Sequence, residues 1–216
     1  MDRLARFLAA TEAHEHAALR ALTLHMLEGL TGSSAHLHDA LQRCAHVTWD
    51  FSDPETLQSS VDAWFCRHVH GLPHRPPDAS KLAEALRRFA DEHLIYSWVL
   101  GELAARCGVD VRLTIRERPY KDVSKLHDAY WLTHLPMLHT DYFMKPVTQP
   151  NTWADELEAV VPWLARDPNE DLAGEVALCL SVLKRDAMAA LALLPTHRLP
   201  EEPHAQATAL LAFAAR

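Results

Sequence analysis

The segment KLAEALRRFADEHLIYSWVLGELAARCG, residues 81–108, decides the fold class that we predict for this chain. Its apolar side chains recur at intervals of three and four residues, which is typical of one face of an α-helix. Gly108 ends the pattern and suits the left-handed turn that often follows a helix. The pattern predicts a single long helix that starts at Asp78 or Ser80 and stops at Gly108.

The composition supports the same class. Only six of the 216 residues are glycine, whereas alanine and leucine are abundant and valine and isoleucine are comparatively scarce. This composition favours helices over sheets. Helical spacing also marks residues 2–29, with one break, and residues 203–215. We therefore expect an all-α protein, either an irregular helical bundle or an α/α toroid-like array of about eight or nine helices.

Two non-helical segments organise the chain. The stretch HGLPHRPPDAS, residues 70–80, contains three prolines and a glycine, so it is expected to form a rigid surface connection. We expect one helical domain over residues 1–216, with residues 71–78 as the candidate internal boundary. Residues 109–118 alternate apolar and polar side chains as a strand does, but no second strand is available, so we expect an extended connection.

Charge and cysteine usage restrict the partners. The formal net charge is −8 and basic residues form no block, so nucleic-acid binding is not expected. No run approaches the roughly 20 apolar residues of a membrane span, and the N-terminus lacks a signal-peptide pattern. The widely spaced cysteines indicate reduced, buried thiols in a cytoplasmic protein. A homodimer formed through an apolar helix face is one expectation.

The segment KLHDAYWLTHLPMLHTDYF, residues 125–143, contains the candidate metal ligands. His127, His134 and Asp141 are seven residues apart and would form one stripe on an ideal helix. Imidazole and carboxylate groups together suit a divalent metal such as Zn or Fe. Residues seven apart rise about 10.5 Å, which is too far for one ion. Pro136 could open a bulge that brings His134 and His139 onto one face.

The predicted metal ligands are therefore His127, His134, His139 and Asp141. A metal-independent alternative uses His134, Asp141 and Tyr130 as catalytic residues that line a pocket, because histidine titrates near neutral pH. In the structural alternative, His127 is solvated, and His134 and His139 only make hydrogen bonds in or beside the core.

The run LHDAYWLTHLPMLHTDYF, residues 126–143, resembles a segment of a family of uncharacterised helical bacterial proteins, the domain of unknown function 6895. The matching positions are Leu132, Thr133, His134, Thr140, Asp141 and Tyr142. The resemblance covers about a tenth of the chain. It implies an all-helical fold and a role in bacterial specialised metabolism, and it favours His134 and Asp141 as site residues.

Two functions remain open. The first is a bacterial enzyme that acts on a small molecule or peptide at a His/Asp-lined pocket. The second is a non-catalytic helical module that binds a protein or ligand and displays a contiguous apolar surface. The exposure of the tryptophan side chains would distinguish the two, in particular that of Trp64, Trp98, Trp131, Trp153 and Trp163.

Overall fold

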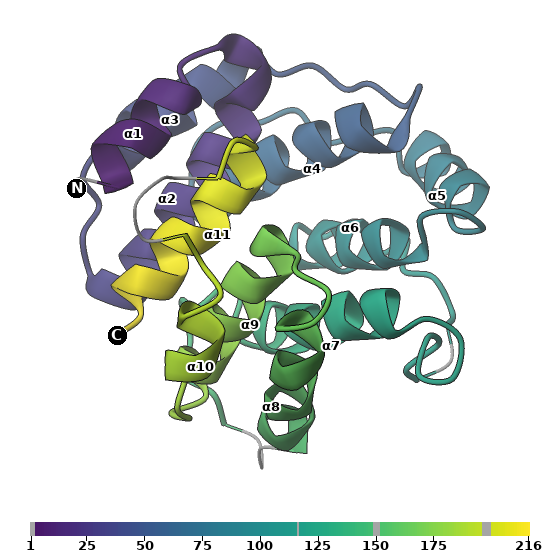
Figure 1. Ribbon diagram of the computed structural model, residues 1–216. Coiled ribbons are helices and arrows are strands. Elements are labelled where there is room, and N and C mark those ends of the chain that lie inside the picture. Colours follow the sequence, from purple (N-terminus) through teal and green to yellow (C-terminus); the bar gives the residue numbers. More distant parts are fainter. Residues whose placement is uncertain (1–2, 116, 149–151, 196–199) are drawn as a thin grey trace. The chain divides into compact units, whose positions relative to one another are not determined.

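The structure, a computed structural model, describes residues 3–115, 117–148, 152–195 and 200–216 (Figure 1). Within these ranges it contains eleven α-helices, two short 3-10 helices and no β-strand. The all-α class is thus confirmed, and the predicted number of helices was too low. The α-helices are α1 (Arg3–Ala10), α2 (Ala17–Thr31), α3 (Leu37–Arg43), α4 (Pro54–Val69), α5 (Ala79–Phe89), α6 (Leu94–Arg106), α7 (Lys125–His139), α8 (Thr152–Leu164), α9 (Glu170–Val182), α10 (Met188–Leu191) and α11 (Pro203–Ala214), and the 3-10 helices are η1 (His14–His16) and η2 (Cys44–His46).

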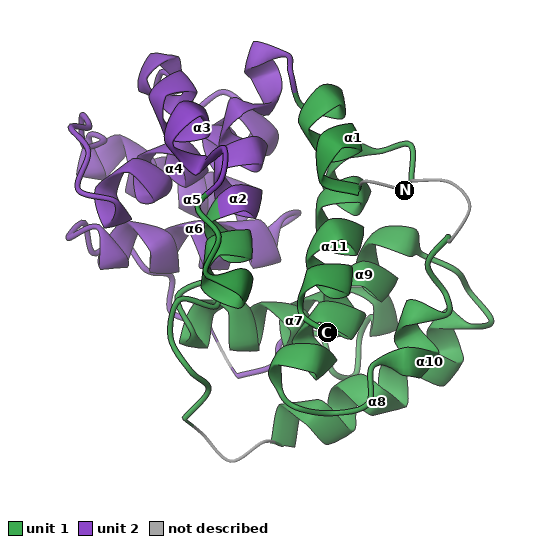
Figure 2. Ribbon diagram, turned by 90° about the vertical axis from the view of Figure 1, so that its left-hand side faces the viewer, with its two compact units in different colours: residues 1–11, 25–34, 120–216 green, residues 12–24, 35–119 purple. Residues whose placement is uncertain are grey.

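The chain divides into two compact units (Figure 2). Unit 1 comprises residues 1–11, 25–34 and 120–216, and unit 2 comprises residues 12–24 and 35–119. The proline-rich segment 71–78 lies inside unit 2, between α4 and α5, so the division does not fall at the predicted boundary.

Helix α4 forms the core of unit 2. Asp53 caps its start, because Oδ1 accepts hydrogen bonds of 3.0 Å from the backbone N–H groups of Glu55 and Thr56. Pro54 occupies the first helical position, where its missing N–H costs no hydrogen bond. All residues from Ser60 to Arg67 are buried, and α3 and α6 pack against this helix. Local residues therefore fix the start of α4.

The prediction of one long helix up to Gly108 was wrong. Residues 90–93 form a turn that separates α5 from α6, and the two helices pack against each other. A single straight helix cannot pack against itself. The break therefore lets α5 and α6 bury apolar side chains against each other. The extended connection predicted after Gly108 is confirmed for residues 109–115, which form no strand.

Helix α9 is the central helix of unit 1, and it packs against α7, α8, α10 and α11. Every residue from Leu172 to Leu180 is buried. A helix that is enclosed on all sides is normally apolar throughout. Helix α9 departs from this rule because it carries Glu175 in its middle and Asp171 in its first turn.

The cysteines Cys44, Cys66, Cys107 and Cys179 are all buried and form no disulfides, as predicted. None of the helices in the described residues is both long and apolar enough to cross a membrane. The tryptophan side chains are all buried or half-buried.

Candidate functional site

A cluster of polar side chains surrounds the first two turns of α9 in unit 1. Asp171 and Glu175 are four residues apart and therefore share one face of α9. The Asn169 side chain caps the helix by accepting a hydrogen bond of 2.9 Å from the backbone N–H of Leu172. This cap fixes the first turn, which carries Asp171.

Three side chains from two other helices hold the Asp171 carboxylate. Tyr130 of α7 donates its hydroxyl to Oδ2 across 3.0 Å. His204 and Thr208 of α11 contact Oδ1 at 2.9 Å and 3.2 Å, respectively. Burial alone would raise the pKa of Asp171, but the charge of His204 and the three hydrogen bonds outweigh burial and lower this pKa. Asp171 is therefore the ionised carboxylate of the cluster.

Glu175 has the opposite protonation preference. Its side chain is only 3% exposed. Burial and the charge of Asp171 raise the pKa of Glu175 to about 8, so the carboxyl group carries a proton at pH 7. Two neighbouring carboxyl groups with pKa values pushed apart are a common feature of functional sites.

Thr133 links Glu175 to the backbone of α7. Its Oγ1 lies 2.8 Å from the carbonyl oxygen of Tyr130 and also contacts Oε2 of Glu175 at hydrogen-bond distance. The hydroxyl has one proton and can donate it only once. When Thr133 donates to the carbonyl oxygen, a protonated Glu175 can donate to Thr133 Oγ1. With the proton on Glu175, each of these two contacts of Thr133 therefore has one donor and one acceptor.

His134 lies beside the cluster on α7. Its Nδ1 is 2.7 Å from the carbonyl oxygen of Tyr130, so Nδ1 carries a proton and donates it. Burial lowers the pKa of His134, which keeps the ring neutral at pH 7. The other ring nitrogen, Nε2, then holds a free lone pair. A neutral imidazole whose Nδ1–H binds a carbonyl oxygen is the form that accepts a proton or a metal.

The cluster also meets the spatial requirement for a metal ion. One ligand atom from each of Asp171, Glu175 and His204 lies within 4.8 Å of the others. Exposure rises across the three side chains, from the buried Glu175 to 23% for Asp171 and 50% for His204. The centre is therefore closed at α9 and open to solvent at α11.

The structure brings together only part of the predicted site. Tyr130 and His134 belong to the cluster, whereas His127 and His139 are exposed. The ring of His127 bonds to Ser124, and that of His139 packs edge-on against Trp153.

The predicted stripe of His127, His134 and Asp141 does not form, because α7 ends at His139. Asp141 lies in a turn with a φ of 49° and pairs with Lys145. Helix α7 also continues as an α-helix through Pro136, so the expected bulge that would unite His134 and His139 is not formed. In the described residues, the four predicted ligands do not converge on one point.

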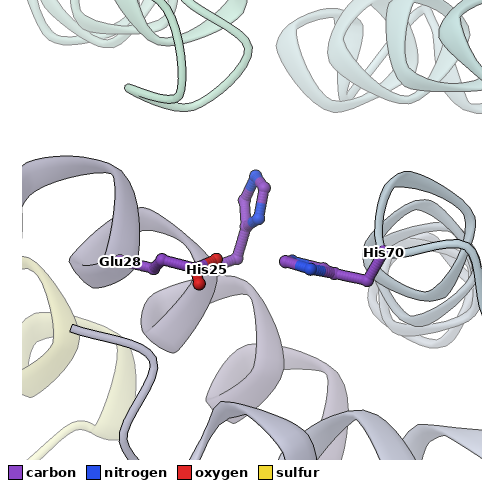
Figure 3. A group of neighbouring side chains, drawn as sticks. All are labelled: His25, Glu28 and His70. Atoms are coloured by element: carbon purple, nitrogen blue, oxygen red, sulfur yellow. The ribbon is translucent and has the colours of Figure 1, made fainter. Parts of the chain in front are cut away.

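A second group of metal-competent side chains consists of His25, Glu28 and His70. Figure 3 shows His25 and Glu28, which lie three residues apart on α2, and His70, which follows α4. His25 and Glu28 belong to unit 1 and His70 to unit 2. Only two ligands thus come from one compact unit, and structural metal sites ordinarily have four.

Sequence reasoning missed Asp171, Glu175 and His204. One signal was present, because Glu175 interrupts the apolar run LAGEVALCL, residues 172–180. A charged residue at a core position normally needs a partner. Its surroundings come from α7 and α11, more than 25 residues away in either direction, and no local pattern indicates them.

The chain matches no family model, and comparisons with curated proteins and with solved structures also gave no match.

Proposed function

We propose that unit 1 contains the divalent-metal centre of an enzyme, with Asp171, Glu175 and His204 as the metal ligands. The observation that carries this proposal is the position of Glu175. Its buried carboxyl group shares a site with the ionised Asp171, and without a cation it must hold a proton. A divalent cation would replace that proton and compensate the negative charges of both carboxylates.

The ligand types indicate which metals fit. Two carboxylate oxygens and one imidazole nitrogen suit Zn or Fe better than Mg or Ca, which prefer oxygen ligands alone. Three protein ligands leave at least one coordination position open, as is usual for catalytic zinc sites. The half-exposed His204 marks the side from which water and substrate can approach.

Tyr130 and His134 have supporting roles in this proposal. Tyr130 orients the Asp171 carboxylate through its hydroxyl, as outer-shell groups commonly do at metal sites. His134 supplies a neutral imidazole beside the centre, which suits a general base. A metal held by these three ligands would use its open coordination position to act as a Lewis acid or to activate a bound water.

A metal-independent reaction is the second candidate, and the contact between His204 and Asp171 favours it. The carboxylate holds Nδ1 of the half-exposed ring at 2.9 Å. A carboxylate that orients a histidine in this way supports general-base catalysis in many hydrolases. Metal content distinguishes the two candidates.

The substrate that we propose is a small molecule or peptide of bacterial specialised metabolism, processed in the cytoplasm. The resemblance of residues 126–143 to helical bacterial proteins supports the metabolic role. The buried, unpaired cysteines are compatible with a reducing compartment.

Elemental analysis of the full chain, purified without chelator, tests the metal centre. We expect about one Zn or Fe per chain and at least a tenfold loss in Glu175→Gln. This variant should fold, because glutamine has the shape of the protonated carboxyl group. Asp167→Asn, an exposed carboxylate variant, and His139→Ala should keep their metal.

Retention of the metal in Glu175→Gln would contradict the proposed ligands, as would a wild-type chain that stays metal-free after supplementation with Zn and Fe. A metal-free chain whose activity depends on His204 would support the second candidate. His134→Ala should reduce activity without unfolding the protein. If it only lowered the melting temperature, the role of His134 would be structural.

A further inference from the structure

Unit 2 contains a cavity of about 840 Å³ that the proposed metal centre does not use. Its walls are the segment that precedes α4, one side of α4, and the proline-rich connection between α4 and α5. Small-molecule pockets have volumes of roughly 300 to 1,000 Å³, so the cavity can hold a ligand of ordinary size.

Aromatic rings form one wall. The rings of Trp49 and Trp64 meet edge to face with centroids 5.4 Å apart, and Phe51 stacks against Trp49 at 6.0 Å. Such a wall offers a flat apolar surface to a planar ring. The indole Nε1 of Trp64 is buried and has no hydrogen-bond partner in the described residues. A buried N–H group without a partner is rare in proteins.

The proline-rich connection forms a wall that is already fixed in place. The buried Arg67 donates hydrogen bonds of 3.0 Å and 2.6 Å to the carbonyl oxygen of Pro73. Trp49 Nε1 donates to the carbonyl oxygen of Arg75 across 2.9 Å. His74 is held by His68 at 3.1 Å. A ligand would therefore lose little binding energy to ordering this loop.

The charges that line the cavity select the ligand. Arg67, Arg75 and Lys81 face only one lining carboxylate, Asp78, whose Oδ1 caps α5. This excess of positive charge occurs on a chain with a formal net charge of −8. The exposed side chains of Arg75 and Lys81 make no ion pair within the described part of the chain. An aromatic wall alone could attract a cation, but three positive side chains disfavour one.

We infer that the cavity of unit 2 binds a planar organic anion, namely an aromatic ring that carries a carboxylate. The ring would lie against Trp49 and Trp64, and the carboxylate would pair with Arg75 and Lys81. This inference is independent of the metal centre, because it uses residues of unit 2 alone.

Isothermal titration calorimetry of the full chain with three probes of one ring and different charge tests the inference. The probes are indole-3-acetate, the neutral indole-3-acetamide and the cationic tryptamine. We expect the anion to bind at least threefold more tightly than the amide and more than tenfold more tightly than the amine. The absence of binding by all three probes would overturn the inference, as would an amine that binds as tightly as the anion.

Charge variants locate the site. Lys81→Gln and Arg75→Gln should each weaken the binding of indole-3-acetate about three- to tenfold, because the anion uses these charges. The affinity for the neutral indole-3-acetamide should change by less than about twofold. Arg87→Gln is the matched control, since Arg87 is an exposed cation of α5 that does not line the cavity. Wild-type affinity for the anion in both cavity variants would contradict the assigned site.

Discussion

Gly174 and Thr208 are in contact where α9 packs against α11. A Cβ added at Gly174 would lie 2.6 Å from Oγ1 of Thr208 and 2.9 Å from its Cβ. Asp171 lies three residues before Gly174, on the same face of α9. The absence of a side chain at Gly174 therefore brings α11 close enough for Thr208 and His204 to reach the Asp171 carboxylate.

Gly174→Ala tests this relationship. Alanine normally stabilises a helix relative to glycine, but here the added methyl group collides with Thr208. We expect the free energy of unfolding to fall by about 1–3 kcal/mol. Chemical denaturation measures the change. In a double-mutant cycle with Thr208→Ala, which removes the nearest atom, Oγ1, strong coupling is expected. A stability gain in Gly174→Ala would show that α9 and α11 do not need this close contact.

Tyr130→Phe should weaken metal binding without unfolding the protein. The substitution removes one of the three hydrogen bonds that orient Asp171 and lower its pKa. We expect metal affinity to fall about 10- to 100-fold, as for other outer-shell groups. Competition with a chromogenic chelator measures the affinity. Tyr120→Phe is the matched control, because the ring of Tyr120 stacks on His127 outside the cluster. Equal affinity in the wild type and Tyr130→Phe would remove Tyr130 from the centre.

The metal-free protein should lose stability as the pH rises from 6.5 to 8. The folded state raises the pKa of Glu175 to about 8, so in this range the folded chain holds a proton that the unfolded chain has released. The titration of Glu175 should lower the free energy of unfolding by about 1.5 kcal/mol over this range. Glu175→Gln should show no such loss. The lowered pKa of His134 acts in the opposite sense and mainly below about pH 7, where it makes stability fall as the pH drops.

Unfolding curves of the chelator-treated protein at several pH values measure this dependence. A stability that stays constant or increases between pH 6.5 and 8 would contradict a protonated Glu175.

The thiols should react slowly in the native protein. Burial raises the pKa of Cys44 and of Cys107 to about 12, and it also raises the pKa of Cys66 and of Cys179. Because the thiolate is the reactive form, labelling by 5,5′-dithiobis(2-nitrobenzoate) at pH 8 should be at least about a hundredfold slower than in denaturant. Rapid labelling of Cys66 or Cys179 without denaturant would contradict their burial.

The parts of the fold that depend only on residues close together in the sequence could be predicted from it. Asp53 and Pro54 mark the start of α4 because capping acts within three residues. The break between α5 and α6 could not be predicted in this way. Periodicity within residues 81–108 suggests one helix, whereas the turn at residues 90–93 lets α5 and α6 pack against each other in unit 2.

The candidate site illustrates the same limit. Tyr130 and His134 were identified because residues 125–143 carry three histidines and two aspartates in an otherwise apolar helical pattern. Their partners Asp171 and His204 are distant in sequence and come together only when α7, α9 and α11 pack in unit 1. Asp141 was misplaced on the stripe because the pattern does not show that α7 ends at His139.

Calorimetric titration of Zn²⁺ into the chelator-treated full chain at pH 7, in two buffers of different ionisation enthalpy, tests the metal centre most directly. We expect one Zn²⁺ per chain and the release of about one proton from Glu175, because its pKa is raised to about 8. The proton release should fall by more than half at pH 8.5. A titration without binding, or binding without proton release at pH 7, would contradict a metal centre built on Glu175.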